Sequence, residues 1–296
     1  MEGQPLLTLQ FLVTGLLTGG IYALVAVGIV LVYKATRIFN FAVGELLALG
    51  GYFCYSFIVW GKFPLWVSLP GALLLAVITG ILVERLVLRP LLGQSLLTII
   101  MSTLALSVLL RGLMLMIWTG YDVAFPKTIL PGKTLLVGMI AMSHELLWAF
   151  GIAIISFAGL AYFFKKTRTG LRMRAVSEDH ELSMSCGVNI TTIFAVTWVM
   201  ATILGTLAGV LMGYRLSLSP STTPLLALKA FPAVIFGGLD SVLGALVGGL
   251  VIGIIESLVG GLIDPNLGEV SVYIVLLLVL LIKPEGLFGL KRIERV

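Results

Sequence analysis

Four ionisable side chains stand inside stretches that are otherwise apolar: Glu45, Arg111, Lys229 and Glu256. A charge at the centre of a bilayer costs about 3 kcal/mol, so such residues face the protein interior or a water-filled passage. Their chemistry is therefore the binding or passing of polar solutes, or the fixing of helices by buried hydrogen bonds. Both roles stay open for the two glutamates and the lysine, whereas Arg111 can also extend its head group to the membrane interface.

The sequence contains no other grouping that is typical of an active site. It has no Ser/His/Asp set, no phosphate-binding loop and no dinucleotide fingerprint. His144 and His180 lie too far apart for metal-ligand spacing, and Cys54 and Cys186 form no disulfide framework. We therefore predict that the chain is not an enzyme and carries no metal or cofactor of its own.

The elements that position these residues are predicted to be membrane-spanning helices. Of the 296 residues, 59% are hydrophobic and 11% charged, whereas soluble domains have about 25% charged residues. About 20 apolar residues cross a bilayer as a helix. We predict one all-α, polytopic domain over residues 1–296 with about nine segments, of which 224–238 is short or re-entrant. The other eight lie near 9–33, 41–60, 65–88, 95–118, 145–164, 191–213, 242–259 and 270–282.

The cations indicate the orientation of these spans. With the N-terminus outside and nine crossings, 13 Lys and Arg residues fall on the cytoplasmic side and four on the outer side. The positive-inside rule therefore predicts an outside N-terminus and a cytoplasmic C-terminus. The formal net charge of +5 does not indicate a nucleic-acid partner, because the cations lie where membrane topology requires them.

Residues 165–189, KKTRTGLRMRAVSEDHELSMSCGVN, form the longest strongly polar stretch, with five cations among its first ten residues. Its charge predicts a cytoplasmic loop. The middle, 173–184, is predicted to form a short helix with charged and apolar faces. Gly187 is predicted to allow a turn with positive φ into the next span. The segment is either a solvated loop that only sets topology or a docking surface for a cytoplasmic partner.

Helix-breaking residues accompany two of the buried charges. Asn40 and Gly44 precede Glu45, which predicts a discontinuous helix, and Lys229 lies between two prolines. Irregular backbone at membrane depth normally lines a cavity. We therefore predict a largely apolar translocation pathway that includes Asn40, Phe41, Glu45, Lys229, Phe231 and Pro232.

Four motifs, in order and at fitting spacing, resemble the permease subunits of branched-chain amino acid ABC importers over about residues 10–290. N-F-A-V-G-E, ending at Glu45, is similar to that family's N-F-A-x-G-E, with Val43 where the family often has histidine. G-L-R-M-R-A at 170–175 with G-V-N at 187–189 resembles its cytoplasmic loop. The block at 229–256 and K-P-E-G-L-F-G at 283–289 resemble its last two motifs.

The resemblance implies the permease fold of vitamin B12 and ribose type importers, in a bacterial or archaeal inner membrane. It also implies a second permease, expected to complete a heterodimer, and two cytoplasmic ATPases that hold ATP and magnesium. An extracytoplasmic binding protein would deliver the solute. The polar segment would then be the coupling loop to an ATPase, through Gly170, Arg172, Arg174, Ala175, Glu178, Asp179 and Gly187.

Two alternatives to an importer of branched-chain or other neutral amino acids stay open. The same family contains importers of urea, short amides and other small solutes. A secondary transporter driven by an ion gradient would also show broken helices and buried charges. It would not need a docking loop, and the sequence has no paired acidic residues that indicate a proton relay.

The predicted orientation has a direct test. A cysteine introduced by Gly3→Cys should react with membrane-impermeant thiol reagents added outside intact cells, because the N-terminus is predicted to be outside. The native Cys186, in the predicted cytoplasmic loop, should react only after permeabilisation and is the internal control. Labelling of Gly3→Cys from the cytoplasmic side alone would reject this topology.

Overall fold

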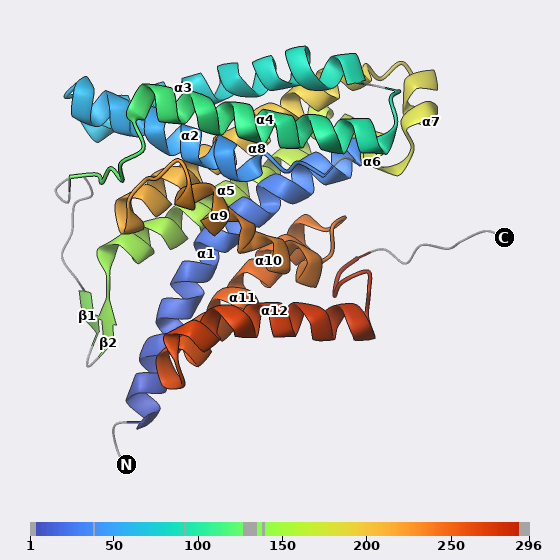
Figure 1. Cartoon of the computed structure of the whole chain (residues 1–296). Coiled ribbons are helices and arrows are strands. Elements are labelled where there is room, and N and C mark those ends of the chain that lie inside the picture. Colours follow the sequence, from blue (N-terminus) through green and yellow to red (C-terminus); the bar gives the residue numbers. More distant parts are fainter. Residues whose placement is uncertain (1–3, 38, 92, 127–134, 138–139, 290–296) are drawn as a thin grey trace. The chain divides into compact units, whose positions relative to one another are not determined.

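The computed structural model describes residues 4–37, 39–91, 93–126, 135–137 and 140–289 (Figure 1). Gly3 and the tail cations after residue 289 lie outside these ranges. The chain divides into two compact units, which we describe separately. The terminal unit contains Met1–Val30, Leu130–Ala153 and Lys229–Val296, and the central unit contains Leu31–Ile129 and Ile154–Leu228.

Eight helices of the described residues are long and apolar enough to cross a membrane, which confirms the all-α, polytopic prediction. Two of them, α2 and α3, continue beyond their α-helical parts in π-helical turns, to Trp60 and Leu88. The eight are α1 (Gln4–Thr36), α2 (Val43–Tyr55), α3 (Leu65–Val83), α4 (Leu96–Trp118), α5 (His144–Lys166), α8 (Ile190–Leu216), α11 (Val242–Leu262) and α12 (Pro265–Ile282).

The predicted ninth segment is indeed too short for an ordinary span. It consists of α9 (Thr222–Leu228) and α10 (Ala230–Gly237), which meet at Lys229. Pro232 is the third residue of α10, where a backbone N–H has no partner within the helix, so the proline is tolerated there.

The connection between α4 and α5 contains a short hairpin that the sequence did not predict. Strands β1 (Leu135–Val137) and β2 (Ile140–Met142) pair antiparallel, with Leu135 opposite Met142. The Gln10 side chain of α1 donates a 2.6 Å hydrogen bond to the Ala141 carbonyl and accepts one of 2.9 Å from its N–H. Strands of three residues are too short to show the period-two pattern on which a strand prediction depends.

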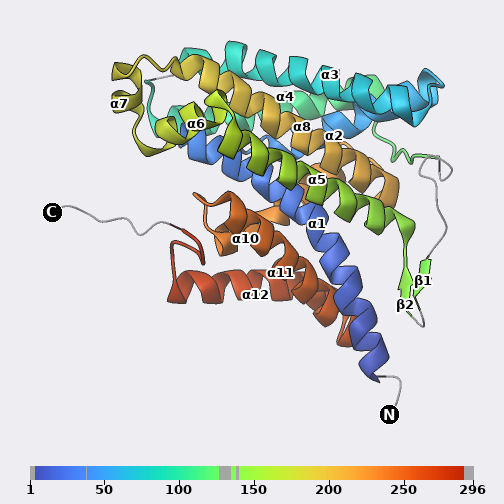
Figure 2. The same cartoon turned by 180° about the vertical axis from the view of Figure 1, so that it is seen from behind.

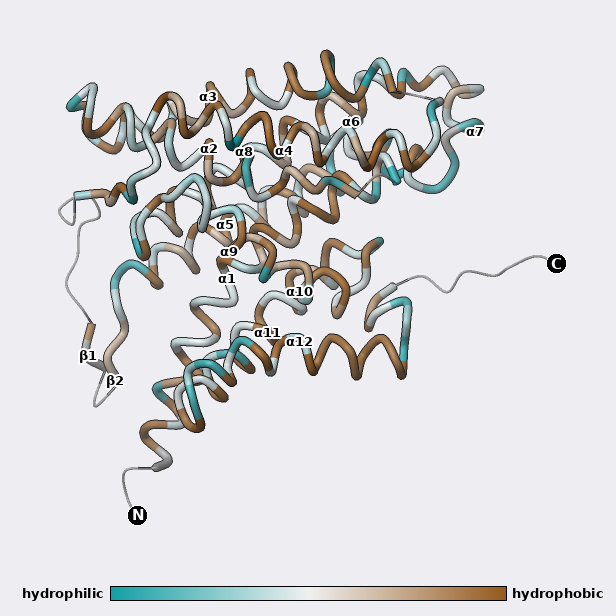
Figure 3. The backbone as a smooth tube through the Cα atoms, in the orientation of Figure 1, coloured by the Kyte–Doolittle hydropathy of each residue, from teal (hydrophilic) through white to brown (hydrophobic). Residues whose placement is uncertain are grey.

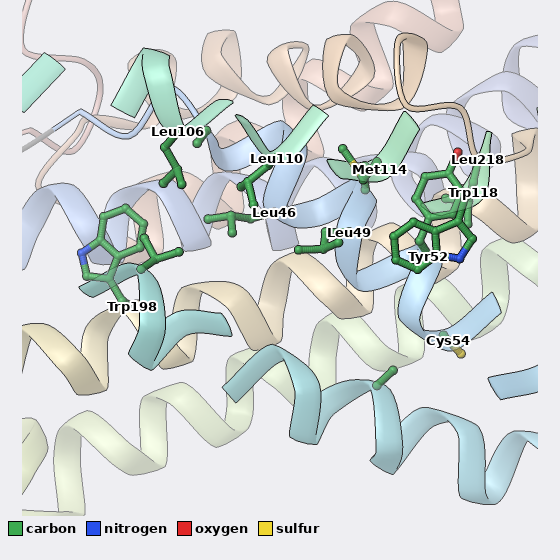
Figure 4. Packing of buried hydrophobic residues seen from close by; sticks show 14 of the residues in the cluster. Leu46, Leu49, Tyr52, Cys54, Leu106, Leu110, Met114, Trp118, Trp198 and Leu218 are labelled. Atoms are coloured by element: carbon green, nitrogen blue, oxygen red, sulfur yellow. The ribbon is translucent and has the colours of Figure 1, made fainter. Parts of the chain in front are cut away.

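The central unit is packed around α2, which contacts α3, α4, α8 and α9. Its buried cluster includes Tyr52 and Trp118, whose ring centroids are 5.0 Å apart, together with Met114 and Leu218 (Figure 4). Glycine lets α2 approach α8 closely, because a Cβ on Gly50 would lie 2.6 Å from the Thr206 Cα. Close backbone approach replaces the hydrophobic driving force that membrane helices lack.

In the terminal unit, small residues spaced four apart bring α1 and α11 together. Gly19 of α1 faces Gly253 of α11, and Ala23 faces Gly249 one turn away. A Cβ on Gly249 would lie 2.5 Å from the Ala23 Cα, so only glycine allows this separation.

The last described residues form hydrogen bonds with the C-terminal end of α10. The N–H groups of Leu287 and Phe288 donate to the carbonyls of Phe236 and Gly237, at 2.8 and 3.0 Å. Gly286 has a φ of 79°, which glycine adopts without strain. The motif at 283–289 therefore satisfies the C-terminal carbonyls that a short helix leaves unpaired.

The α1–α11 contact predicts a difference between two glycines. Gly249→Ala should lower the stability of the purified protein by about 1–3 kcal/mol, because the added methyl group overpacks the contact. Gly151→Ala on α5 is the matched control, since a Cβ there meets nothing within 4 Å. Thermal unfolding in detergent micelles measures both variants. Equal unfolding temperatures would show that the α1–α11 contact does not limit stability.

Candidate functional site

The residues before α2 form a defined turn rather than a break within a helix. The Asn40 Oδ1 accepts a 2.9 Å hydrogen bond from the Ala42 N–H, and α2 begins at Val43. The predicted discontinuous helix at 40–45 is therefore wrong: the irregular backbone precedes α2, because the Asn40 side chain completes the turn first. Gly44 lies against α9, where a Cβ would meet the Pro224 Cα at 2.8 Å.

Glu45, in the first turn of α2, forms an ion pair with Arg111 of α4. Its Oε1 lies 2.7 Å from the arginine Nη2, and the glutamate side chain is only 3% exposed. The Arg111 side chain, 39% exposed, is directed at this carboxylate rather than extended to the interface, which corrects the alternative drawn for it from sequence. Arg111 neutralises the Glu45 carboxylate, which would have a higher free energy alone in lipid or beside a buried water.

Lys229 and Glu256 also belong to one cluster, in the terminal unit. The Lys229 Nζ lies 3.5 Å from the Glu256 Oε1 and 3.3 Å from the Glu269 Oε2. The Tyr22 hydroxyl of α1 donates a 2.6 Å hydrogen bond to the other oxygen of Glu256. The cluster therefore joins the residue before α10 to α1, α11 and α12, and it contains one more carboxylate than ammonium.

Sequence reasoning identified two members of this cluster and missed the other two. Tyr22 is an ordinary aromatic residue in a long apolar span, and Glu269 lies near the start of α12 with its side chain 54% exposed. The one available signal was the opposite charge of Lys229 and Glu256 in two neighbouring apolar segments.

The predicted pathway residues fall into two groups. Asn40, Phe41 and Glu45 lie in the central unit, where the Phe41 ring centroid is 5.5 Å from that of Phe39. Lys229, Phe231 and Pro232 lie in the terminal unit. Among the described residues, no three His, Cys, Asp or Glu side chains come together as metal ligands.

The polar segment between α5 and α8 forms two helices, α6 (Arg168–Glu178) and α7 (His180–Ser185). The prediction of one helix over 173–184 is wrong because Asp179 interrupts it with extended backbone, at φ −151° and ψ 117°. Its Oδ1 accepts a 2.9 Å hydrogen bond from the Leu182 N–H and so caps α7. Aspartate favours this position over a helix interior.

One face of α6 is attached to the ends of the neighbouring spans. Met173 and Val176 are buried in a cluster with Ile193 and Phe194 of α8. Gly170 is buried against α5, where a Cβ would lie 2.8 Å from the Phe164 Cα. α6 is therefore packed directly against the ends of α5 and α8.

The other face of the α6–α7 pair is exposed. Of the predicted coupling residues, all except the buried glycine are exposed: Arg172, Arg174, Ala175, Glu178, Asp179 and Gly187. Leu171, Leu182 and Met184 add large exposed apolar side chains. Gly187 has a φ of 79°, which confirms the predicted positive φ. Figure 3 shows hydrophilic residues around these two helices beside mostly hydrophobic spans.

A groove of about 610 Å³ lies beside this pair, at the start of α8. Met184, Val188 and Phe194 line it together with the polar Asn189. On the other side, the Arg37 Nη2 donates a 3.1 Å hydrogen bond to the Ser177 carbonyl near the end of α6. The α6–α7 pair therefore combines an exposed mixed surface with direct contact to the segment that leads into α2.

The spans contain ion pairs, and the polar α6–α7 pair is packed against the ends of two spans. Both features are expected of a multi-pass membrane transport protein. The comparison with protein families is specific. Residues 11–282 match the family described as "Branched-chain amino acid transport system / permease component", and the chain belongs to this family. It is a multi-pass protein of the inner membrane.

The curated relatives agree with this family. The chain is 31% identical to the high-affinity branched-chain amino acid transport system permease protein BraD of Pseudomonas aeruginosa, over 97% of this chain and 98% of that protein. It is 29% identical to the permease protein LivH of the corresponding Escherichia coli K12 system, over the whole of both chains. The ribose import permease protein RbsC of Escherichia coli K12 is 27% identical over 79% of this chain and 73% of its own length. No solved structure matches the chain.

The Glu45–Arg111 pair predicts non-additive effects on stability. Glu45→Ala and Arg111→Ala each leave one charge without its partner, so each should destabilise the purified protein. The double variant should be more stable than the sum of the single effects predicts, by about 1–3 kcal/mol. Chemical unfolding of the four proteins in one detergent measures this coupling. Additive single effects would mean that the two charges do not stabilise each other.

Proposed function

We propose that the chain is the permease subunit of an ATP-driven importer of branched-chain amino acids and forms half of its translocation pore. A second permease would complete the pore as a heterodimer, and an extracytoplasmic binding protein would deliver the amino acid. The observation that carries the proposal is the exposed α6–α7 pair, at the position of the family's cytoplasmic loop. The names of the full-length relatives supply the substrate class.

In this proposal, a cytoplasmic ATPase receives the α6–α7 pair in a surface groove, while ATP and magnesium stay on the ATPase subunits. The exposed face offers both charges and apolar side chains, which suits a helix that binds in a groove. The ATPase would contact Arg172, Arg174, Ala175, Glu178 and Asp179. Movement caused by ATP binding would reach α5 and α8 through the buried face, and α2 through the Arg37–Ser177 contact.

The ion pairs favour a zwitterionic solute. Glu45 is neutralised by Arg111, and Lys229 by Glu256 and Glu269. A pathway beside these groups would present a mostly apolar wall on which each of these charges has an opposite charge within 3.5 Å, with one carboxylate in excess at Lys229. Conduction requires weak binding, so affinity would belong to the extracytoplasmic binding protein.

The proposal is tested in liposomes that contain this chain with its second permease and the two ATPases. The wild-type complex should take up labelled leucine when ATP and the binding protein are supplied. Glu178→Lys or Ala175→Trp should lower uptake by about tenfold or more, because a central interface residue contributes over ~1.4 kcal/mol. Size-exclusion chromatography of the chain alone checks that it is still folded.

Asp122→Lys is the matched charge reversal. Asp122 is exposed in the connection after α4, away from the α6–α7 pair in sequence, and this variant should transport normally. Normal uptake and normal substrate-stimulated ATP hydrolysis by Glu178→Lys and Ala175→Trp would leave α6–α7 with a topological role only. Leucine uptake by this chain without ATPases, driven by a proton or sodium gradient, would instead support a secondary transporter.

A further inference from the structure

An apolar groove of about 530 Å³ runs between α3, α5 and α8 in the central unit, three helices that Figure 2 shows as neighbours. Among its 13 lining residues, only Ser156 has a polar side chain. Leu160 and Leu204 are buried and form its floor. Gly159 faces its open space, since a Cβ at this position would meet nothing within 4 Å.

The length of the groove matches one leaflet of a bilayer. Its lining residues on α8 extend from Ala195 to Leu207. At 1.5 Å per residue these cover about 18 Å of helix. The hydrocarbon core of a bilayer is about 30 Å thick, so one leaflet contributes about 15 Å. An extended acyl chain of one leaflet therefore has a continuous apolar surface to occupy.

Basic residues gather at one end of this groove. α3 and α8 run antiparallel, because Thr202 donates a hydrogen bond to the Ala76 carbonyl while Gly80 lies against Val199. Arg85, four residues after the lining residue Ile81, therefore lies toward the start of α8. Lys166, three residues after the lining residue Phe163, lies toward the same end, and both basic residues are exposed.

We propose that this groove binds an anionic glycerophospholipid, with an acyl chain along α8 and the phosphate between Arg85 and Lys166. The apolar lining selects hydrocarbon, and the cations select a negatively charged head group. By the positive-inside rule, this basic end is expected on the cytoplasmic side of the membrane. The head groups of anionic lipids in the cytoplasmic leaflet would lie at the same level. This site is separate from the predicted pathway residues and does not depend on which solute is transported.

Binding of palmitoyl-oleoyl phosphatidylglycerol to the full-length chain in detergent, followed by native mass spectrometry, tests the acyl part of the site. Gly159→Leu should weaken binding about tenfold, because the new side chain occupies the groove. Gly112→Leu on α4 is the matched control: a Cβ there also meets nothing within 4 Å, but α4 does not line the groove. Its binding should equal that of the wild type, and unfolding temperatures verify that both variants fold.

The double variant Arg85→Gln/Lys166→Gln tests the head-group part. It should weaken phosphatidylglycerol binding by about thirtyfold, since each cation near an anionic lipid surface contributes about 1 kcal/mol. Binding of phosphatidylcholine with the same acyl chains should not change. Unaltered phosphatidylglycerol binding by Gly159→Leu, or an equal loss in Gly112→Leu, would overturn the proposal. So would a Gly159→Leu chain that keeps its lipid but no longer assembles with the second permease, since the groove would then be a protein interface.

Discussion

Neutralising charge where water is absent is the constraint on which the rest of this structure depends. Glu45 is almost fully buried, and a lone carboxylate there would cost several kcal/mol. Its partner Arg111 is 66 residues away in the sequence, so the pair joins α2 to α4. The Lys229 cluster of the terminal unit is more exposed, but it also joins distant segments, linking the residue before α10 to three spans. In each unit, the described ion pairs therefore join helices that are distant in the sequence.

Between helices in lipid, the attraction comes from close packing of the helix backbones rather than from the hydrophobic effect. Gly19, Gly249 and Gly253 bring α1 and α11 together, and Gly50 brings α2 against α8. This close packing is also what carries polar side chains within reach of one another, such as the Tyr22 hydroxyl and the Glu256 carboxylate. The small residues and the buried charges are thus parts of one arrangement.

The spans could be predicted from sequence because their length and composition depend only on the bilayer. Gly187 could be predicted as well, because a turn between two helices often requires positive φ. The interruption at Asp179 was missed because a good capping residue can break a helix that contains no proline. The Glu45–Arg111 pairing and the role of Glu269 were missed for another reason. They depend on which helices are neighbours, and hydrophobic periodicity does not determine that in a chain whose helices are apolar on every side.

The contact between the chain end and α10 has a consequence for biosynthesis. The carbonyls of Phe236 and Gly237 are satisfied by N–H groups that lie about fifty residues further along the chain. A ribosome therefore releases α10 into the insertion machinery well before its partners exist. Until those residues are made, the two carbonyls have only water or other protein groups as hydrogen-bond partners. The completion of α10 is thereby tied to synthesis of the last residues, and a chain truncated before residue 287 would leave both carbonyls without these partners.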